Sequence, residues 1–225
     1  MNIILFGPPG AGKGTQAEKI VTAFDLHKVS TGDLLRKEVK DETEIGKKIK
    51  SLMDKGSFVS DDTMNDLIRK ILSNNIYHNR IIFDGYPRNL NQAKSFNILL
   101  KKYDQKISLV LSLDVDKETL VKRVLGRRTC TKCGFTFNKY FNPATNKDHT
   151  CDSRFLKKRT DDNEKTILNR YESYLEKTLP MLNFYKDLNL FHQINGKGKI
   201  DEIFDEIRGI ITTLEAWLCE SYLYK

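Results

Sequence analysis

A glycine-rich stretch near the start of the chain holds the first residues that could do chemistry. Residues 7–16 read GPPGAGKGTQ, close to the phosphate-binding pattern G-x-x-x-x-G-K-[ST]. Glycines let backbone N–H groups wrap an anion, and Lys13 can reach the terminal phosphates of a nucleotide. A plain glycine turn is the alternative. The apolar segment before the loop and the helical pattern after it favour the phosphate site.

One position departs from that pattern, and it concerns the metal. Gly14 follows Lys13, so the hydroxyl that usually contacts Mg²⁺ arrives one residue late, at Thr15. The ion must then be held by phosphate oxygens, by Thr15, or by waters anchored on nearby carboxylates. Asp33 and Asp84 each stand at the head of a motif and are the candidates to anchor those waters.

The elements that position these residues follow from the hydrophobic pattern. Apolar runs predict strands over 2–6, 80–88, 106–115 and 190–194, with helical patterns between them. Strands that are continuously apolar and separated by helices are typical of a parallel sheet covered on both faces, so we expect an α/β fold. The last helix carries an apolar stripe that should face the core, formed by Ile200, Ile203, Phe204, Ile207, Ile211, Leu214 and Leu218.

Two stretches break the alternation of strand and helix. Residues 30–60 are polar and helix-like without an obvious strand, and residues 126–162 are rich in Cys, Arg, Lys, Asn and Asp. We interpret both as inserted lobes. A chain of 225 residues allows one large core with such lobes and does not require a second domain.

Composition narrows the class of protein. The net charge of +8 indicates an anionic partner, either nucleic acid or a phosphorylated small molecule. No run approaches the ~18 apolar residues of a membrane span, and no charged leader precedes the apolar segment after Met1, so we expect a cytoplasmic protein. The four cysteines do not resemble a secreted disulfide framework, and Cys219 is interpreted as a spare thiol.

Five motifs, in order along nearly the whole chain, resemble those of adenylate kinases. They are GPPGAGKGT at 7–15, STGDLLR at 30–36, FDGYPRNLNQA at 83–93, GRR at 126–128 and RTDDNEKTILNR at 159–170. The resemblance implies a single P-loop kinase domain over 1–225, with a parallel sheet flanked by helices, an inserted AMP-binding lobe at 30–60 and a lid at 126–162. It also implies Mg²⁺-dependent phosphoryl transfer between ATP and AMP that gives two ADP. The lid would close to exclude water, and the chain would be a monomer that binds neither nucleic acid nor membrane.

The resemblance assigns roles to basic residues because phosphoryl transfer needs fixed positive charge around the moving group. Arg36 and Arg88 resemble the ligands of the AMP phosphate, while Arg159 and Arg170 would serve the phosphate junction from the lid side. The ATP-side arginines, Arg123 and Arg127, are four residues apart and expected on one helix face. No general base is required, since the acceptor is already ionised. The implied catalytic set is Lys13, Arg88, Arg123, Arg127, Arg159 and Arg170.

Further binding residues follow from the same motifs. The ATP side adds Gly10, Ala11, Gly12, Gly14, Thr15, Thr136, Phe137 and Gly198. The AMP side adds Thr31, Ser57, Phe58, Val59, Gly85, Tyr86, Pro87 and Gln92. Thr31 and Gln92 match positions where the family recognises adenine, and the Gln92 amide offers both donors and acceptors to a purine edge. Uridylate and cytidylate kinases are the alternative, but they usually differ at these two positions and have a short lid.

Cysteines in the lid indicate a structural metal. Cys130 and Cys133 have the C-x-x-C spacing of zinc sites. In zinc-carrying bacterial-type adenylate kinases the other two ligands lie ten and seven residues before the lid arginine that corresponds to Arg159. That register gives His149 and Asp152, with Cys151 displaced by two residues and able to replace His149 if the loop adjusts. A metal-free, hydrogen-bonded lid is the alternative.

Two functions of other classes account for less of the sequence. A zinc-knuckle nucleic-acid binder would explain the positive charge and the C-x-x-C pair, but neither the P-loop nor the arginines. A P-loop module that binds nucleotide without transfer would explain the loop alone. The enzyme interpretation covers all of these features.

Overall fold

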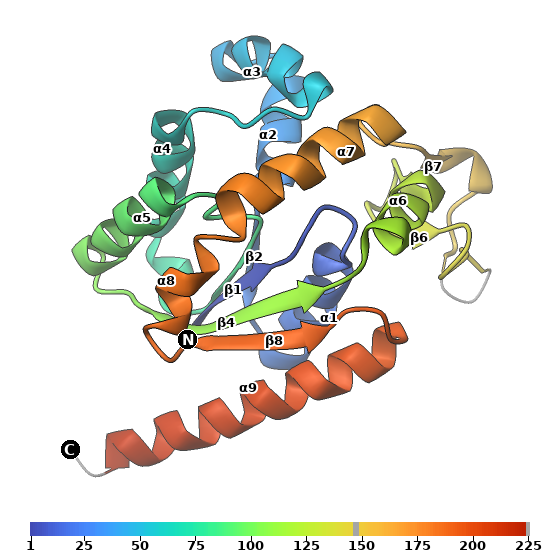
Figure 1. Cartoon of the computed structure of the whole chain (residues 1–225). Coiled ribbons are helices and arrows are strands. Elements are labelled where there is room, and N and C mark those ends of the chain that lie inside the picture. Colours follow the sequence, from blue (N-terminus) through green and yellow to red (C-terminus); the bar gives the residue numbers. More distant parts are fainter. Residues whose placement is uncertain (146–148, 224–225) are drawn as a thin grey trace.

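A five-stranded parallel sheet forms the centre of the protein (Figure 1). The computed structural model describes residues 1–145 and 149–223, without the side chains of residues 75 and 218–223. The strand order is β2-β3-β1-β4-β8. Their bounds are β1 Asn2–Phe6, β2 His27–Ser30, β3 Ile81–Asp84, β4 Ile107–Asp114 and β8 Phe191–Asn195. The predicted α/β class and the four predicted strands are confirmed, although β3 ends at Asp84, before the GYPR turn.

Helices cover both faces of the sheet, as the continuous apolar strands predicted. Along β1, Ile3 and Leu5 point to one face, while Ile4 and Phe6 point to the other. Nine α-helices lie within the described residues: α1 Lys13–Phe24, α2 Thr31–Lys40, α3 Glu44–Lys55, α4 Asp61–Leu72, α5 Leu90–Lys102, α6 Lys117–Gly126, α7 Glu164–Ser173, α8 Leu182–Lys186 and α9 Ile200–Leu223. A π-helical turn, Tyr174–Thr178, and 3₁₀ turns at Asn75–Tyr77 and Ser153–Phe155 complete the described helical segments.

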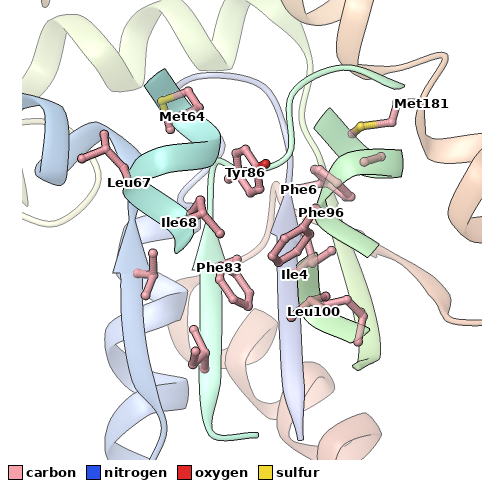
Figure 2. Packing of buried hydrophobic residues seen from close by; sticks show 14 of the residues in the cluster. Ile4, Phe6, Met64, Leu67, Ile68, Phe83, Tyr86, Phe96, Leu100 and Met181 are labelled. Carbon is pink, nitrogen blue, oxygen red and sulfur yellow. The ribbon is translucent and has the colours of Figure 1, made fainter. Parts of the chain in front are cut away.

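The core is divided into two clusters by the sheet. On one face, α4 and α5 pack on the strands through residues such as Met64, Ile68 and Phe96 (Figure 2). On the other face, α1 and α9 pack through residues such as Ile20 and Ile207. The predicted stripe of the last helix is confirmed where its side chains are described, because Ile203, Ile207 and Ile211 are buried. Leu218 and Cys219 lie outside the described side chains.

The segment 30–60 begins in the last residue of β2 and continues as α2 and α3. Strand β2 was not predicted. These two helices cross very closely at Gly46, where an added Cβ would lie 2.0 Å from the carbonyl oxygen of Glu38. Thr43 caps α3 by accepting a hydrogen bond from the Gly46 amide at 3.0 Å. The lobe is therefore a compact helical pair beside the sheet.

The segment 126–162 has a small sheet of its own, which lies beyond α6 in Figure 1. It is antiparallel, with the order β6-β5-β7. Its strands are β5 Arg127–Cys130, β6 Thr136–Asn138 and β7 Leu156–Lys157. The segment 126–162 thus has a sheet separate from the central one, whereas Leu35 and Ile49 of the segment 30–60 belong to the core cluster on one face of the central sheet. None of the described helices is long and apolar enough to cross a membrane.

Candidate active site

The glycine-rich loop connects β1 to α1 and packs against α6. Gly10 and Gly12 have φ angles of 87° and 99°, which side-chain-bearing residues rarely adopt. An added Cβ on Gly10 would lie 2.8 Å from Cγ2 of Val124. The loop therefore depends on glycine both for its turn and for its close approach to α6, and α1 begins at Lys13 as predicted.

Lys13 folds back over this loop. Its Nζ donates hydrogen bonds to the carbonyl oxygens of Gly7 at 2.7 Å and Pro8 at 3.0 Å. Burial is the main cause that lowers the pKa of Lys13 to about 8; the charge of Asp84 opposes this shift, and the charges of nearby arginines contribute to it. The ammonium group thus stands at the mouth of a loop of backbone donors, where an anion would stabilise its charge.

Arg123 joins α6 to the loop. Its Nη1 donates to the carbonyl oxygen of Ala11 at 3.2 Å, and its guanidinium lies 5.4 Å from the ring centre of Phe141. Arg127 does not share its helix face, and that prediction was wrong. The helix ends at Gly126 and Arg127 is extended, with ψ of 138°, at the start of β5.

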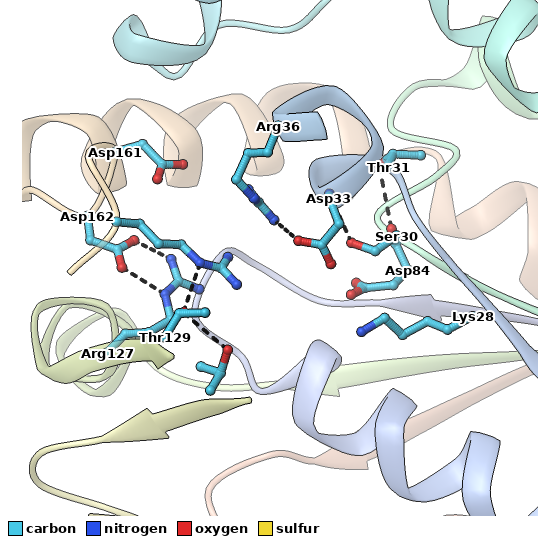
Figure 3. Close-up of polar contacts among 12 residues, drawn as sticks. Lys28, Ser30, Thr31, Asp33, Arg36, Asp84, Arg127, Thr129, Asp161 and Asp162 are labelled. Atoms are coloured by element: carbon cyan, nitrogen blue, oxygen red, sulfur yellow. Dashed lines mark hydrogen bonds and ion pairs between the residues drawn. The ribbon is translucent and has the colours of Figure 1, made fainter. Parts of the chain in front are cut away.

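Arg127 instead pairs with Asp162 at the base of the lid (Figure 3). Its Nε donates to Oδ2 of Asp162 at 2.9 Å, and Nη2 contacts Oδ1. Burial alone would lower the pKa of Arg127, but its hydrogen bonds and ion pair with the buried Asp162 raise it. This fork-to-carboxylate geometry fixes the direction of the guanidinium.

The two arginines of the last motif lie in the same region. Arg170 pairs with Asp161 at 2.8 Å. The Nε of Arg159 donates to Oγ1 of Thr129 at 3.3 Å. Burial lowers the pKa of Arg159 to about 10, and the charges of Arg127 and Arg36 add to the shift. The predicted lid-side arginines therefore converge on one place.

Arg88 lies in the connection between β3 and α5. Its Nε donates to the carbonyl oxygen of Gly85 at 2.8 Å, and its guanidinium lies 5.4 Å from the ring centre of Phe58. Burial lowers the pKa of Arg88 to about 10, and the next largest cause is the charge of Arg170. The positive charges in this cluster lower one another's pKa values. Such a group of basic residues is typical of a site that binds a polyanion.

Two carboxylates face the loop. Asp84 is the last residue of β3 and pairs in register with Ser30 of β2; Asp33 lies in the first turn of α2, close to it in Figure 3. Burial raises the pKa of Asp84, against the charges of Lys13 and Lys28. Burial also acts to raise the pKa of Asp33, but the Arg36 ion pair outweighs it and the net shift is downward.

Thr31 and its neighbours build the wall next to Arg88. Thr31 is fully buried, and its hydroxyl donates to the carbonyl oxygen of Gly85 at 3.0 Å. Tyr86 is also buried, its hydroxyl donates to Oδ1 of Asn65 at 2.8 Å, and the Tyr86-Pro87 bond is cis. Of the segment after α3, Val59 is buried, Phe58 is half-buried and Ser57 is exposed.

Gln92, in the first turn of α5, is held by two protein groups. Its Oε1 accepts from the backbone N–H of Arg88 at 2.8 Å, and its Nε2 donates to Oδ1 of Asp61 at 2.7 Å. The side chain is 1% exposed. One N–H and one lone pair of the amide are left over by these two bonds.

Comparison with known proteins agrees with this geometry. The family model for adenylate kinase matches residues 5–190. An adenylate kinase of Pelagibacter ubique is 47% identical over 211 residues, which cover 94% of this chain and 99% of that protein. The chain belongs to the adenylate kinase family. Adenylate kinases of Bacillus cytotoxicus and Methanothrix thermoacetophila are each 42% identical, over 94% and 96% of this chain and 98% and 100% of their own lengths.

The lid of this adenylate kinase holds a cluster of possible metal ligands. Ligand atoms of Cys130, Cys133, His149 and Cys151 all lie within 4.8 Å of one another. Cys130 is buried, and its Sγ accepts from the Cys133 amide at 3.5 Å. Burial opposes ionisation of Cys130, but hydrogen bonds from Cys133, His149 and Lys132 outweigh it and lower the pKa of Cys130 to about 6.

Asp152 is not in this cluster, which corrects the register-based prediction. Its Oδ1 accepts from the amide of Arg154 at 2.8 Å, so its carboxylate caps the 3₁₀ turn that follows. His149 and Cys151, predicted as alternatives, are both present in the cluster. Asp152 caps the turn that follows it, and the residue before it, Cys151, joins the cluster instead.

Other predicted ATP-side residues differ in their accessibility. Phe137 is buried and packs edge-on against His149, with ring centres 5.0 Å apart, so its side chain belongs to the interior of the lid. Thr136 is half-buried, and its hydroxyl lies 3.2 Å from that of Thr129. Gly198 is exposed in the turn before α9.

Several residues that shape this adenylate kinase site were not singled out from the sequence. Asp161 and Asp162 orient two of the arginines, and their signal was the DD of the RTDDNEKT motif. Gln16 is buried in α1 and donates to the carbonyl oxygen of Ile200 at 2.9 Å, which ties α9 to the loop helix. Asp61 holds Gln92, and no local pattern marks it.

Proposed function

We propose that this adenylate kinase transfers a phosphoryl group between ATP and AMP through six basic residues of one site. The reaction, which gives two ADP, is that of the family, and the chain is an enzyme of this family. The observation that carries the assignment of residues is the gathering of partly buried basic groups around the phosphate loop and the base of the lid. The proposed set is Lys13, Arg88, Arg123, Arg127, Arg159 and Arg170.

In this proposal the chain supplies position and charge. Backbone N–H groups of residues 10–15 and Lys13 bind the donor phosphates, with Arg123 and Arg127 beside them. Arg36 and Arg88 bind the acceptor phosphate, and Arg159 and Arg170 stabilise charge on the group in transfer. No side chain is required to remove a proton, because the acceptor oxygen of AMP is already ionised. The lid, 126–162, excludes water from the site and so prevents hydrolysis.

The residues also fit Mg²⁺, which would bridge phosphate oxygens and neutralise their charge. Asp84 and Asp33 would anchor its waters. An added Cβ on Gly14 would lie 3.8 Å from Oδ2 of Asp84, so the position that usually carries the hydroxyl opens directly toward this carboxylate. Oxygen ligands and retained water are what Mg²⁺ prefers.

Adenine recognition is proposed for Thr31 and Gln92, with Ser57, Phe58 and Val59 lining the acceptor side. The remaining donor and acceptor of the Gln92 amide support this assignment. Gly198, in the turn before α9, is proposed to contact the ATP base. Gln16 supports this by tying the start of α9 to α1, the helix that follows the phosphate loop.

A structural zinc ion is proposed for the lid. Three thiols and one imidazole are ligands that zinc favours, and four atoms at about 2.3 Å from the ion would lie about 4 Å from one another. The spread of 4.8 Å in the cluster is compatible with this. One nitrogen of the imidazole, Nε2 of His149, is buried and has no hydrogen-bond partner within the described part of the chain. Zinc would hold the lid together and take no part in transfer.

We also infer that the enzyme acts as a monomer in the cytoplasm, as the family resemblance implies. The test of the reaction is a coupled assay of ADP formation with ATP, Mg²⁺ and each monophosphate in turn. We expect activity with AMP well above that with UMP, CMP or GMP. Absence of activity with AMP would overturn the proposed function, and a preference for UMP or CMP would overturn the proposed acceptor.

A further inference from the structure

The amide of Gln92 has an orientation that the backbone determines. A backbone N–H can only donate, so the Gln92 atom 2.8 Å from the Arg88 amide must be the carbonyl oxygen Oε1. The other atom, Nε2, then points at Asp61. Asn89 obeys the same rule, because its Oδ1 accepts from the backbone N–H of Gln92 at 2.8 Å and its Nδ2 donates to Asp61 at 2.9 Å.

Asp61 receives both of these amide donors on one oxygen. The Oδ1 of Asp61 lies 2.7 Å from Nε2 of Gln92 and 2.9 Å from Nδ2 of Asn89. An ionised carboxylate accepts hydrogen bonds and donates none. A flipped Gln92 amide would set its oxygen against the carboxylate of Asp61 and its NH₂ against the N–H of Arg88. The side chain of Asp61 and the backbone N–H of Arg88 therefore hold the Gln92 side-chain amide in one orientation.

We infer that Asp61 is a specificity-determining positioning residue, which makes Gln92 select adenine over hypoxanthine and guanine. The inference rests on the proposed role of Gln92 at the acceptor base. In the fixed orientation, the amide offers its second N–H on one side and its second lone pair on the other. Adenine presents N1 as an acceptor beside the N6 amino donor, which matches that pair. Hypoxanthine and guanine present N1–H beside O6, which requires the flipped amide.

The place of Asp61 in the chain suits this role. It is the first residue of α4, two residues after Val59, which lies in the proposed AMP-binding lobe. Its neighbour Asp62 is exposed, lies in the same first turn, and has no recorded hydrogen bond or ion pair among the described residues. The pair offers a matched comparison, because Asp→Asn at either position removes one negative charge from the same helix end.

The experiment compares AMP with inosine 5′-monophosphate, which differs only in carrying N1–H and O6. For Asp61→Asn we expect kcat/KM for AMP to fall roughly ten-fold, as for loss of one hydrogen bond to a charged group, and that for inosine monophosphate to fall less. The KM for ATP should not change. Asp62→Asn should leave the ratio of the two acceptors at its original value.

Two further variants separate positioning from general damage. The Ser hydroxyl of Asp61→Ser can also donate to a flipped amide, so this variant should lower the ratio of kcat/KM for AMP to that for inosine monophosphate, as Asp61→Asn does. Urea unfolding checks that each variant is folded. In a Gln92→Ala background, Asp61→Asn should no longer change the ratio, because Asp61 acts through Gln92. Equal loss for both acceptors, or an undiminished effect without Gln92, would overturn the inference. Failure of the unaltered enzyme to use AMP would overturn the proposed function instead.

Discussion

Arg127 and Asp162 stand at the two ends of the lid and are joined through both oxygens of a fully buried carboxylate. The lid therefore leaves and re-enters the core at one point. The same pair fixes the direction of a guanidinium that is proposed to contact phosphate. Stability of the lid and geometry of the site are coupled in one contact.

We expect Asp162→Asn to lower both stability and turnover. The substitution leaves the largely buried Arg127 charge with a neutral partner, and removing one member of a buried pair costs about 3 kcal/mol. Urea unfolding measures the free energy of unfolding. A lower kcat would reflect displacement of the Arg127 guanidinium. The control is Asp66→Asn, which breaks an exposed pair with Arg69 worth less than about 1 kcal/mol. Equal, small losses for both variants would contradict the prediction.

Asp84→Asn should weaken Mg²⁺-dependent turnover about 10- to 100-fold while nucleotide affinity measured without Mg²⁺ changes little, because the carboxylate acts through metal-bound water.

The raised pKa of Asp84 also predicts that kcat/KM begins to fall, as the pH is lowered, at a pH above the usual aspartate range, since the carboxylate is protonated at a higher pH. A raised carboxyl pKa destabilises the fold at pH values above it, and this is relieved as pH falls. The variant should thus be at least as stable as the parent at pH 7. Equal losses of turnover and affinity would count against the anchoring role.

Binding of ATP should draw a proton from solution near pH 8. With its pKa lowered to about 8, Lys13 is about half neutral at that pH, and phosphate charge would restore its proton, so uptake of up to about 0.5 proton is expected. Titration calorimetry in two buffers of different ionisation enthalpy measures it. Lys13→Met should abolish the uptake, and uptake that survives this change would show that another group is responsible.

The pKa of Lys13 also predicts a pH dependence of stability. The charged lysine is less favourable in the folded chain than in the unfolded chain, so this penalty is full below about pH 8 and is lost between pH 8 and 10.5. The difference in unfolding free energy between Lys13→Met and the parent should accordingly shrink over that range. Urea unfolding at pH 7 and pH 10 tests the trend, which a pH-independent difference would contradict.

Zinc content should distinguish Cys151 from Asp152. We expect the purified protein to carry one zinc, Cys151→Ser to lose it, and Asp152→Asn to keep it, because only Cys151 belongs to the ligand cluster. Metal analysis of protein purified without chelator gives the stoichiometry. Removal of the metal should also make residues 126–162 more sensitive to protease. Retention of zinc by Cys151→Ser together with its loss from Asp152→Asn would restore the register-based assignment.

The sequence predicted the centre of the fold because its central strands are mostly apolar along their whole length. β1 and β4 are buried on both faces, and no other structure explains such short continuous runs between helices. β2 was missed because HKVS is short, half polar and at the edge of the sheet, where only one neighbour pairs with it. With the polar His27 and Lys28 among its four residues, β2 carries too little apolar pattern to be recognised in this way.

Features set by contacts distant in sequence were not predictable from spacing. Gly126, the last residue of α6, is packed against the segment that follows β5, since a Cβ there would lie 2.6 Å from Oδ1 of Asn138. Counting back from Arg159 assumed a fixed loop path, but the Asp152 cap turns the chain and brings Cys151 inward. The spacing of residues along the sequence identified which residue types form each site. Contacts between distant parts of the chain decided which of two neighbouring residues, such as Cys151 and Asp152, belongs to it.

The room beside Gly14 bears on how such loops change over time. Its backbone lies within α1 without a positive φ, and a Cβ would meet Oδ2 of Asp84 only at ordinary contact distance. Neither strain nor crowding in the protein itself excludes a serine there. A single substitution could therefore move the loop from water-mediated to direct metal coordination without rebuilding the core, so the two types of phosphate loop are neighbours in sequence space.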